Sequence, residues 1–397
     1  MNDNDSSMDA PQQNSNGSTS ARHRSSMHRQ TTRAESLRSM PPASGIGVHT
    51  DPTKPARQVD QALTTKRMVT LGMLFPLFIM VMMPLVMTGM THHLSPHDMK
   101  VAVIGSRDRV EQAEKDLDKQ TANSFDVSRV DSVNQAKDDI KDHSLRAAYN
   151  PATGDMYYAG ANGSQVKSAV TNLFSSTAQE SQTTLSTHDV APAASEDNLA
   201  NIAVYLALGA VLGGFMAGMI LGLIPVATWL RVVLALVMPA IVAFGEILYG
   251  WGMFGIFDSS ALAPWFMFYL LGLSCLAVTT GGMLLIGPAM MPISMLLMPF
   301  LGMSASGING PLDMINGFYG GVNPWLFSAQ GIEAVRDAIY FPEAALTQPV
   351  WVMIAWTVGG VLLAALGTMR QKRRHLFAQM NDVQEATSLI PAAAVAP

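Results

Sequence analysis

Charged residues interrupt the apolar second half of the chain at one short stretch, "NPWLFSAQGIEAVRDAIYF" (323–341). Apolar side chains recur there at i, i+3 and i+7 (Ile332, Val335, Ile339), and polar ones share the opposite side (Gln330, Glu333, Arg336, Asp337, Tyr340). This spacing predicts an amphipathic helix. Glu333 and Arg336 are three residues apart, so they can pair and lower the cost of placing either charge in a partly dehydrated site.

Two other charged residues lie within or beside long apolar runs. Glu246 is the one acidic residue well inside such a run, and carboxylates within a membrane usually face a cavity or a partner. An exposed Glu at the membrane interface is the alternative. Arg231 and Arg336 are the only cations between residues 199 and 369. Arg231 is either a contact for a cytoplasmic partner or an anchor that reaches the lipid headgroups.

The residues needed for several kinds of catalysis are missing from the apolar half. The string nearest to a phosphate-binding loop, "GANGSQVKS" (160–168), lacks the Gly-Lys-Ser/Thr junction. A serine protease would need a histidine, and none occurs between His188 and His375. Metal binding by the histidines at 92, 93 and 97 lacks further ligands. We therefore expect neither an enzyme nor a cofactor or metal site in this chain.

The composition and the apolar runs predict an α-helical membrane protein. The chain is 49% hydrophobic and 14% charged. The hydrocarbon core of a membrane is about 30 Å thick. Apolar runs that we assign to crossings of this core cover 68–90, 199–224, 228–254, 263–287, 289–303 (a short one) and 350–369. These predict six transmembrane helices with a re-entrant amphipathic element before the last one, because the Gly-rich stretch after residue 303 cannot lie bare in lipid.

The predicted organisation follows from these spans. We expect a disordered cytoplasmic tail (1–57), an interfacial helix (58–67), a first transmembrane helix (68–91), a small extracellular α/β domain (92–198), a five-helix membrane domain (199–369, re-entrant element 304–341) and a basic cytoplasmic tail (370–397). "KVAVIG" and "FDVSRV" read as strands of that domain. The basic residues at 66–67 and 370–374 place both termini in the cytoplasm.

Glycines recur at four-residue spacing in "GAVLGGFMAGMILG" (209–222). Such spacing allows two helices to approach closely. We expect packing within the chain, with a seam between two copies as the alternative.

The order of these features resembles the membrane subunit of type-2 ABC exporters, in the phage-infection-protein-like group. The resemblance covers 58–375 and is most specific at "PISMLLMPFLGMSASGINGPLDMINGFYGGVNPWLFSAQGIEAVRDAIYF", with Pro311, Asn323, Pro324 and Arg336 at the matching positions. It implies a permease that exports an amphipathic or lipid-like substrate across a bacterial plasma membrane. ATP would be bound by a separate cytoplasmic ABC ATPase subunit, and a second permease copy or a paralogue would complete the assembly, without nucleic acid.

The resemblance also assigns residues to roles. Contact with the ATPase falls to the 57–67 helix and the short loop "GLIPVATWLR" (Pro225, Thr228, Trp229, Arg231), which is shorter than the family's coupling loop. For the translocation path or gate, the resemblance indicates Pro311, Asn323, Pro324 and Arg336, and the charges of Glu246 and Glu333 in apolar surroundings add these two residues. The alternative function is a membrane-anchored surface receptor or secretion scaffold without transport.

Overall fold

The computed structural model describes residues 76–86, 88, 96–105, 124–180, 182–194, 197, 200–257, 260–308, 311–315 and 317–388. All of them belong to one unit, Arg67–Pro397. The predicted N-terminal tail and the interfacial helix lie outside the described residues, as do His92, His93 and half of the first predicted span (68–91).

A five-stranded mixed sheet, here called the sheet domain with its helices, occupies the described residues from 96 to 190. Its strands are β1 (Met99–Ile104), β2 (Phe125–Val130), β3 (Ala147–Asn150), β4 (Asp155–Tyr158) and β5 (Ser186–Asp189), in the order β2-β1-β3-β4-β5. β1 is parallel to β2 and β3, while β3 and β4 form an antiparallel hairpin. The strands predicted from "KVAVIG" and "FDVSRV" are confirmed.

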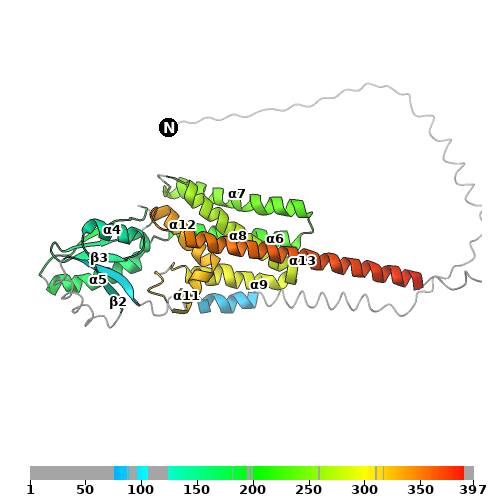
Figure 1. The fold of residues 1–397 in the computed structure, drawn as a ribbon, viewed down its shortest axis with the longest axis horizontal. Coiled ribbons are helices and arrows are strands. Elements are labelled where there is room, and N and C mark those ends of the chain that lie inside the picture. Colours follow the sequence, from blue (N-terminus) through cyan, green and yellow to red (C-terminus); the bar gives the residue numbers. More distant parts are fainter. Residues whose placement is uncertain are drawn as a thin grey trace, which may run out of the picture. The chain divides into compact units, whose positions relative to one another are not determined.

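Each face of the sheet is covered by one of the helices among the described residues (Figure 1). α5 (Ser164–Glu180) packs Phe174 against Val101 and Tyr149, and α4 (Val133–Lys141) packs Ile140 against Ala148 on the other face. The alternation along β3 produces this arrangement, because successive side chains of a strand point to opposite faces.

Four segments of the described residues are long and apolar enough to cross a membrane: Ile202–Leu223, Thr228–Phe254, Leu262–Ala305 and Thr347–Gln384. They contain α6 (Ile202–Leu223), α7 (Thr228–Phe254), α8 (Leu262–Ile286) and most of α13 (Thr347–Ser388). A shorter apolar helix covers Pro76–Val86. These are the features of an α-helical membrane protein, and the count of six spans stays a prediction.

Close backbone contacts fix the directions of these helices. Gly214 and Gly222 of α6 lie against Cys275 and Met283 of α8, so the two helices run in the same direction. The Gly-rich face thus packs within the chain, which confirms that prediction. α13 also runs parallel to α8, because Gly360 meets Ala277 and Gly367 meets Leu284. α7 runs the opposite way: Gly209 and Gly213 of α6 meet Glu246 and Val242.

The chain reverses after α8 at Gly287, whose φ of 72° is readily adopted only by glycine. The returning segment comprises η2 (Gly287–Ala289), α9 (Met290–Met295), the π-helical η3 (Leu296–Leu301) and α10 (Gly302–Ala305). It lies back along α8, since Met290 contacts Gly282 and Thr279 bonds the sulfur of Met298. Pro299 within η3 cannot donate a helical hydrogen bond, which accounts for the irregular helix.

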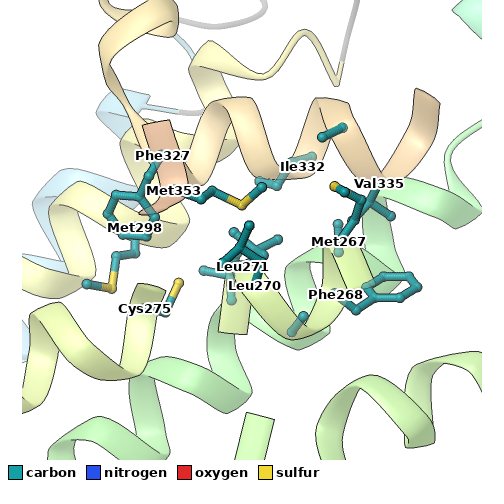
Figure 2. Close-up of a cluster of buried hydrophobic side chains, with 14 of the residues drawn as sticks. Met267, Phe268, Leu270, Leu271, Cys275, Met298, Phe327, Ile332, Val335 and Met353 are labelled. Carbon is teal, nitrogen blue, oxygen red and sulfur yellow. The ribbon is translucent and has the colours of Figure 1, made fainter. Parts of the chain in front are cut away.

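Between this returning segment and α13 lie α11 (Gly317–Val322), η4 (Asn323–Trp325) and α12 (Phe327–Tyr340). The predicted amphipathic helix is confirmed as α12. Figure 2 shows its apolar face: Phe327, Ile332 and Val335 pack with Leu271 of α8 and Met353 of α13. The apolar side of α12 is therefore part of the main helical core.

Candidate functional site

The polar side of α12 is also covered by protein. Arg336 and Asp337 are buried, at 5% and 8% exposure. An amphipathic helix on a protein surface normally turns its polar face to water. The described residues that cover this face come from the sheet domain and from the loop after residue 310. Six residues meet there and are called the charge cluster: His143, Arg146, Asp313, Glu333, Arg336 and Asp337.

Two ion pairs of the charge cluster join residues far apart in sequence. His143 Nε2 lies 3.1 Å from Asp337 Oδ1, which joins the end of α4 to α12. Arg146 Nε lies 3.1 Å from Asp313 Oδ2, and the Arg146 guanidinium also lies 3.5 Å from His143 Nδ1. Apolar contact reinforces this junction, since the His143 ring lies 4.2 Å from the Phe341 ring at the end of α12.

Within α12 the charges pair more loosely. Arg336 lies 3.7 Å from Glu333 Oε1 and 3.8 Å from Asp337 Oδ1. Both distances exceed those of a good charge-assisted hydrogen bond. Arg336 Nε and Asp313 Oδ1 are buried without a hydrogen-bond partner. A buried polar network that is only partly satisfied is costly, so this cluster stabilises the junction less than a fully hydrogen-bonded network would.

The charge cluster holds three carboxylates and two guanidinium groups beside His143. Burial and the neighbouring Asp337 raise the pKa of the Glu333 carboxyl, while Arg336 opposes that shift. Protons can therefore change the charge at this junction.

Asn323 connects the cluster to the returning segment. Its side-chain amide donates to the backbone carbonyl of Ala305 at 2.7 Å and to Glu333 Oε2 at 3.3 Å. Its own carbonyl accepts from Gln330 Nε2 at 2.6 Å. The structure thus brings together the predicted site residues Asn323, Glu333 and Arg336, and Asn323 links α10 to α12 at the helical break.

The two predicted prolines lie beside the cluster. Pro311 begins the loop that carries Asp313, and its carbonyl accepts from Met314 N at 2.8 Å. Met314 is buried in the sheet-domain core with Val170 and Phe174. Pro324 occupies the first turn of η4, directly after Asn323. Both prolines shape backbone that positions charged or amide side chains.

The other predicted residues lie away from the cluster. Glu246 is half-buried in the seam between α6 and α7, where its carboxylate contacts Gly209. Arg231 donates to the carbonyls of Leu221 and Ile224, both at 3.2 Å.

Arg231 thus satisfies carbonyls at the end of α6, and its contact with a cytoplasmic partner or with lipid headgroups stays a prediction. Pro225, Thr228 and Trp229 of the same loop are exposed.

Sequence reasoning missed His143 and Arg146, which lie 194 and 167 residues from their partners. The only sequence feature that pointed to them was the charge of α12. Glu333 and Asp337 outnumber Arg336, so a buried site there needs a further cation. Among the described residues, no group of three His, Cys, Asp or Glu side chains could hold a metal ion. Searches of protein families, curated proteins and solved structures find no match to the chain.

Proposed function

We propose that the chain is the permease subunit of an ATP-driven exporter of the type-2 ABC kind, with a separate ATPase subunit and an amphipathic or lipid-like substrate. The observation that carries the proposal is the buried charge cluster, which ties the sheet domain to a short helix placed after a helical break. A protein that uses its helices only as an anchor needs no such junction. The resemblance stated above supplies the class of transporter.

The arrangement of helices supports a membrane domain of this type. α6, α7, α8, the returning segment and α13 alternate in direction, as successive crossings of a bilayer must. Arg231 and Arg370 lie at the ends of α6 and α8, where both bond backbone carbonyls. Under the positive-inside rule this end faces the cytoplasm. The sheet domain then lies outside the plasma membrane and both termini lie inside.

The proposed roles of the site residues follow from these placements. The exposed loop residues Pro225, Thr228 and Trp229 contact the ATPase, while Arg231 holds the loop to the end of α6. The gate between the returning segment and α12 is formed by Asn323, Glu333 and Arg336. Pro311 and Pro324 shape the backbone next to it. A shift of the sheet domain would pull directly on this gate through Asp337 and Asp313.

The alternative is a surface receptor or secretion scaffold. One observation favours it: β5 is an edge strand whose four residues are all exposed. An exposed edge strand can pair with a strand of another protein. Under this alternative the charge cluster would only hold the sheet domain in place.

Purification of the full chain in mild detergent, with identification of bound proteins and an ATPase assay, tests the proposal. We expect a stoichiometric subunit with a phosphate-binding loop. Trp229→Ala should weaken its binding without loss of folded permease, because Trp229 is 69% exposed. Trp325→Ala, at a tryptophan of similar exposure placed next to the gate, is the matched control. Recovery of strand-binding partners alone, with no ATPase, would overturn the proposal.

A further inference from the structure

Glu246 is the only charged side chain between Arg231 and Asp258. It lies in the second half of α7, within one of the four membrane-spanning candidates. A carboxylate in such a segment is expensive unless a cavity, a partner or a ligand compensates it. Its surroundings therefore indicate what neutralises it.

The α6–α7 seam leaves room for this carboxylate. A Cβ atom at Gly209 would collide with Glu246 Oε1, so the missing side chain makes the space that the acid fills. One turn away the seam is closed in the ordinary way, with Val242 against Gly213. The Glu246 side chain as a whole is half-buried, so it meets α6 without being enclosed by protein.

Both basic residues of the membrane domain have partners other than Glu246. Arg231 and Arg336 are its only basic residues from 199 to 369. Arg231 is bonded to the carbonyls at the end of α6, and Arg336 faces Glu333 and Asp337. Within the part of the chain that the structure describes, no hydrogen bond to the Glu246 carboxylate is formed. Its counter-charge must come from outside these helices, unless a proton neutralises it.

Two tyrosines flank the seam toward one end. Tyr205 lies one turn before Gly209 on α6, and Tyr249 lies one turn after Glu246 on α7. Because α6 and α7 are antiparallel, with Leu206 beside Gly250, both tyrosines lie on the same side of Glu246 along the seam. They are 59% and 53% exposed. Aromatic faces next to a carboxylate are suited to an ammonium head group.

The exposed surface of α6 supplies an apolar track beside this seam. Leu212, Met216 and Ile220 are exposed and lie on the same side of α6 as Gly209. A molecule whose head is held at Glu246 could extend an alkyl chain along them, as lipid tails do on any membrane-facing helix.

We propose that the α6–α7 seam at Glu246 is a binding site for a cationic amphiphile, with its ammonium head on the carboxylate and its alkyl chain along α6. This names the substrate class of the exporter and so rests on the proposed function. The carboxylate provides the charge, Gly209 provides the space, and Tyr205 and Tyr249 provide the aromatic faces.

Binding to the full chain in nanodiscs of zwitterionic lipid tests the site without any ATPase. The probe is trimethylammonium-diphenylhexatriene, detected by energy transfer from tryptophan, and uncharged diphenylhexatriene is the matched probe. We expect the wild type to bind the cation about tenfold more tightly than the neutral probe, a ratio that corresponds to about 1.4 kcal/mol. Glu246→Gln should abolish this preference and Glu246→Asp should retain most of it.

Glu343→Gln is the control variant, because Glu343 is an exposed acid outside the spans. It should keep the tenfold preference. If Glu246→Gln binds both probes as the wild type does, the carboxylate does not hold the ammonium head and the inference is overturned. Glu246→Asp separates loss of charge from loss of fold, since a misfolded seam would fail in both variants.

The outcomes for this site and for the exporter are separable. Cation preference that depends on Glu246, with no ATPase co-purifying, would uphold the site and overturn the exporter. An ATPase partner with no role for Glu246 in binding would uphold the exporter and overturn the site.

Discussion

Charged residues make long-range contacts at one end of the helical region and local contacts at the other. Beside α12, His143 and Arg146 reach carboxylates more than 160 residues away in sequence. At the α6–α7 loop, Arg231 reaches carbonyls only 10 and 7 residues away. The first arrangement joins separate parts of the fold, and the second closes the end of one helix.

This difference teaches where movement can be transmitted. A side chain bonded to the carbonyls of its own helical hairpin moves with that hairpin. A side chain bonded to a carboxylate on another element transfers force between the two. We therefore expect perturbations of the charge cluster to spread across the sheet domain and α12, and perturbations of Arg231 to stay local.

The largest effect is expected from Arg336→Leu. It leaves Glu333 and Asp337 without their nearby cation in a buried site, and breaking one partner of a buried pair costs about 3 kcal/mol. Denaturant unfolding in detergent would measure the loss. The control is Arg129→Leu, whose ion pair with Asp131 is exposed and worth about 0.5 kcal/mol. Equal losses in the two variants would contradict the buried role of Arg336.

A double-mutant cycle between His143 and Asp337 sharpens the comparison. The single changes His143→Ala and Asp337→Asn should each destabilise the protein, and their coupling should be about 1 kcal/mol because the two side chains are in direct contact. The same cycle on the solvent-exposed Lys141 and Glu343 pair should give about 0.3 kcal/mol. Additive effects at His143 and Asp337 would show that this contact carries no energy.

Arg231→Ala should have a smaller and local effect. The loss of two hydrogen bonds to carbonyls at a half-exposed position should cost about 1 kcal/mol. Hydrogen exchange should rise within residues 221–231 and stay unchanged in α12. Faster exchange in both regions would contradict the claim that Arg231 acts only locally.

The smallest effect is a change in pH dependence at Glu333. Because the folded-state pKa of Glu333 is raised above its ordinary value of about 4.3, the folded state holds the proton more tightly than the unfolded state. Stability is therefore greatest below the unfolded pKa and falls as the pH rises through the folded pKa. Glu333→Gln should flatten this fall in thermal unfolding between pH 4 and 8. An unchanged profile would contradict burial as the cause.

Local pattern made much of the fold predictable. Alternating apolar residues located β1 and β2, and the spacing of Ile332, Val335 and Ile339 located α12. β5 was missed because its four residues are all exposed and show no alternation. The two spans predicted over 263–287 and 289–303 are joined by the turn at Gly287 and together form the apolar segment Leu262–Ala305.

The candidate site was predictable only on one side. The three-residue spacing of Glu333 and Arg336 on a helix predicted that they pair. Their other partners depend on how the sheet domain packs against α12, which local spacing does not show. Nothing in the residues around His143 and Arg146 indicates a long-range contact, because tertiary contacts of this length leave no periodic signal. Arg231 was a similar case: its bonds go to backbone carbonyls, which sequence does not distinguish.

The most direct test of the account is hydrogen exchange of the full chain in nanodiscs, comparing wild type with Arg146→Ala. Arg146 lies in the sheet domain and contacts Asp313 and His143, and His143 in turn reaches α12 through Asp337. The account predicts faster exchange in 327–340 as well as around residue 313, with no change at 221–231. Exchange in 327–340 that stays as in the wild type would contradict the claim that the charge cluster couples the sheet domain to α12.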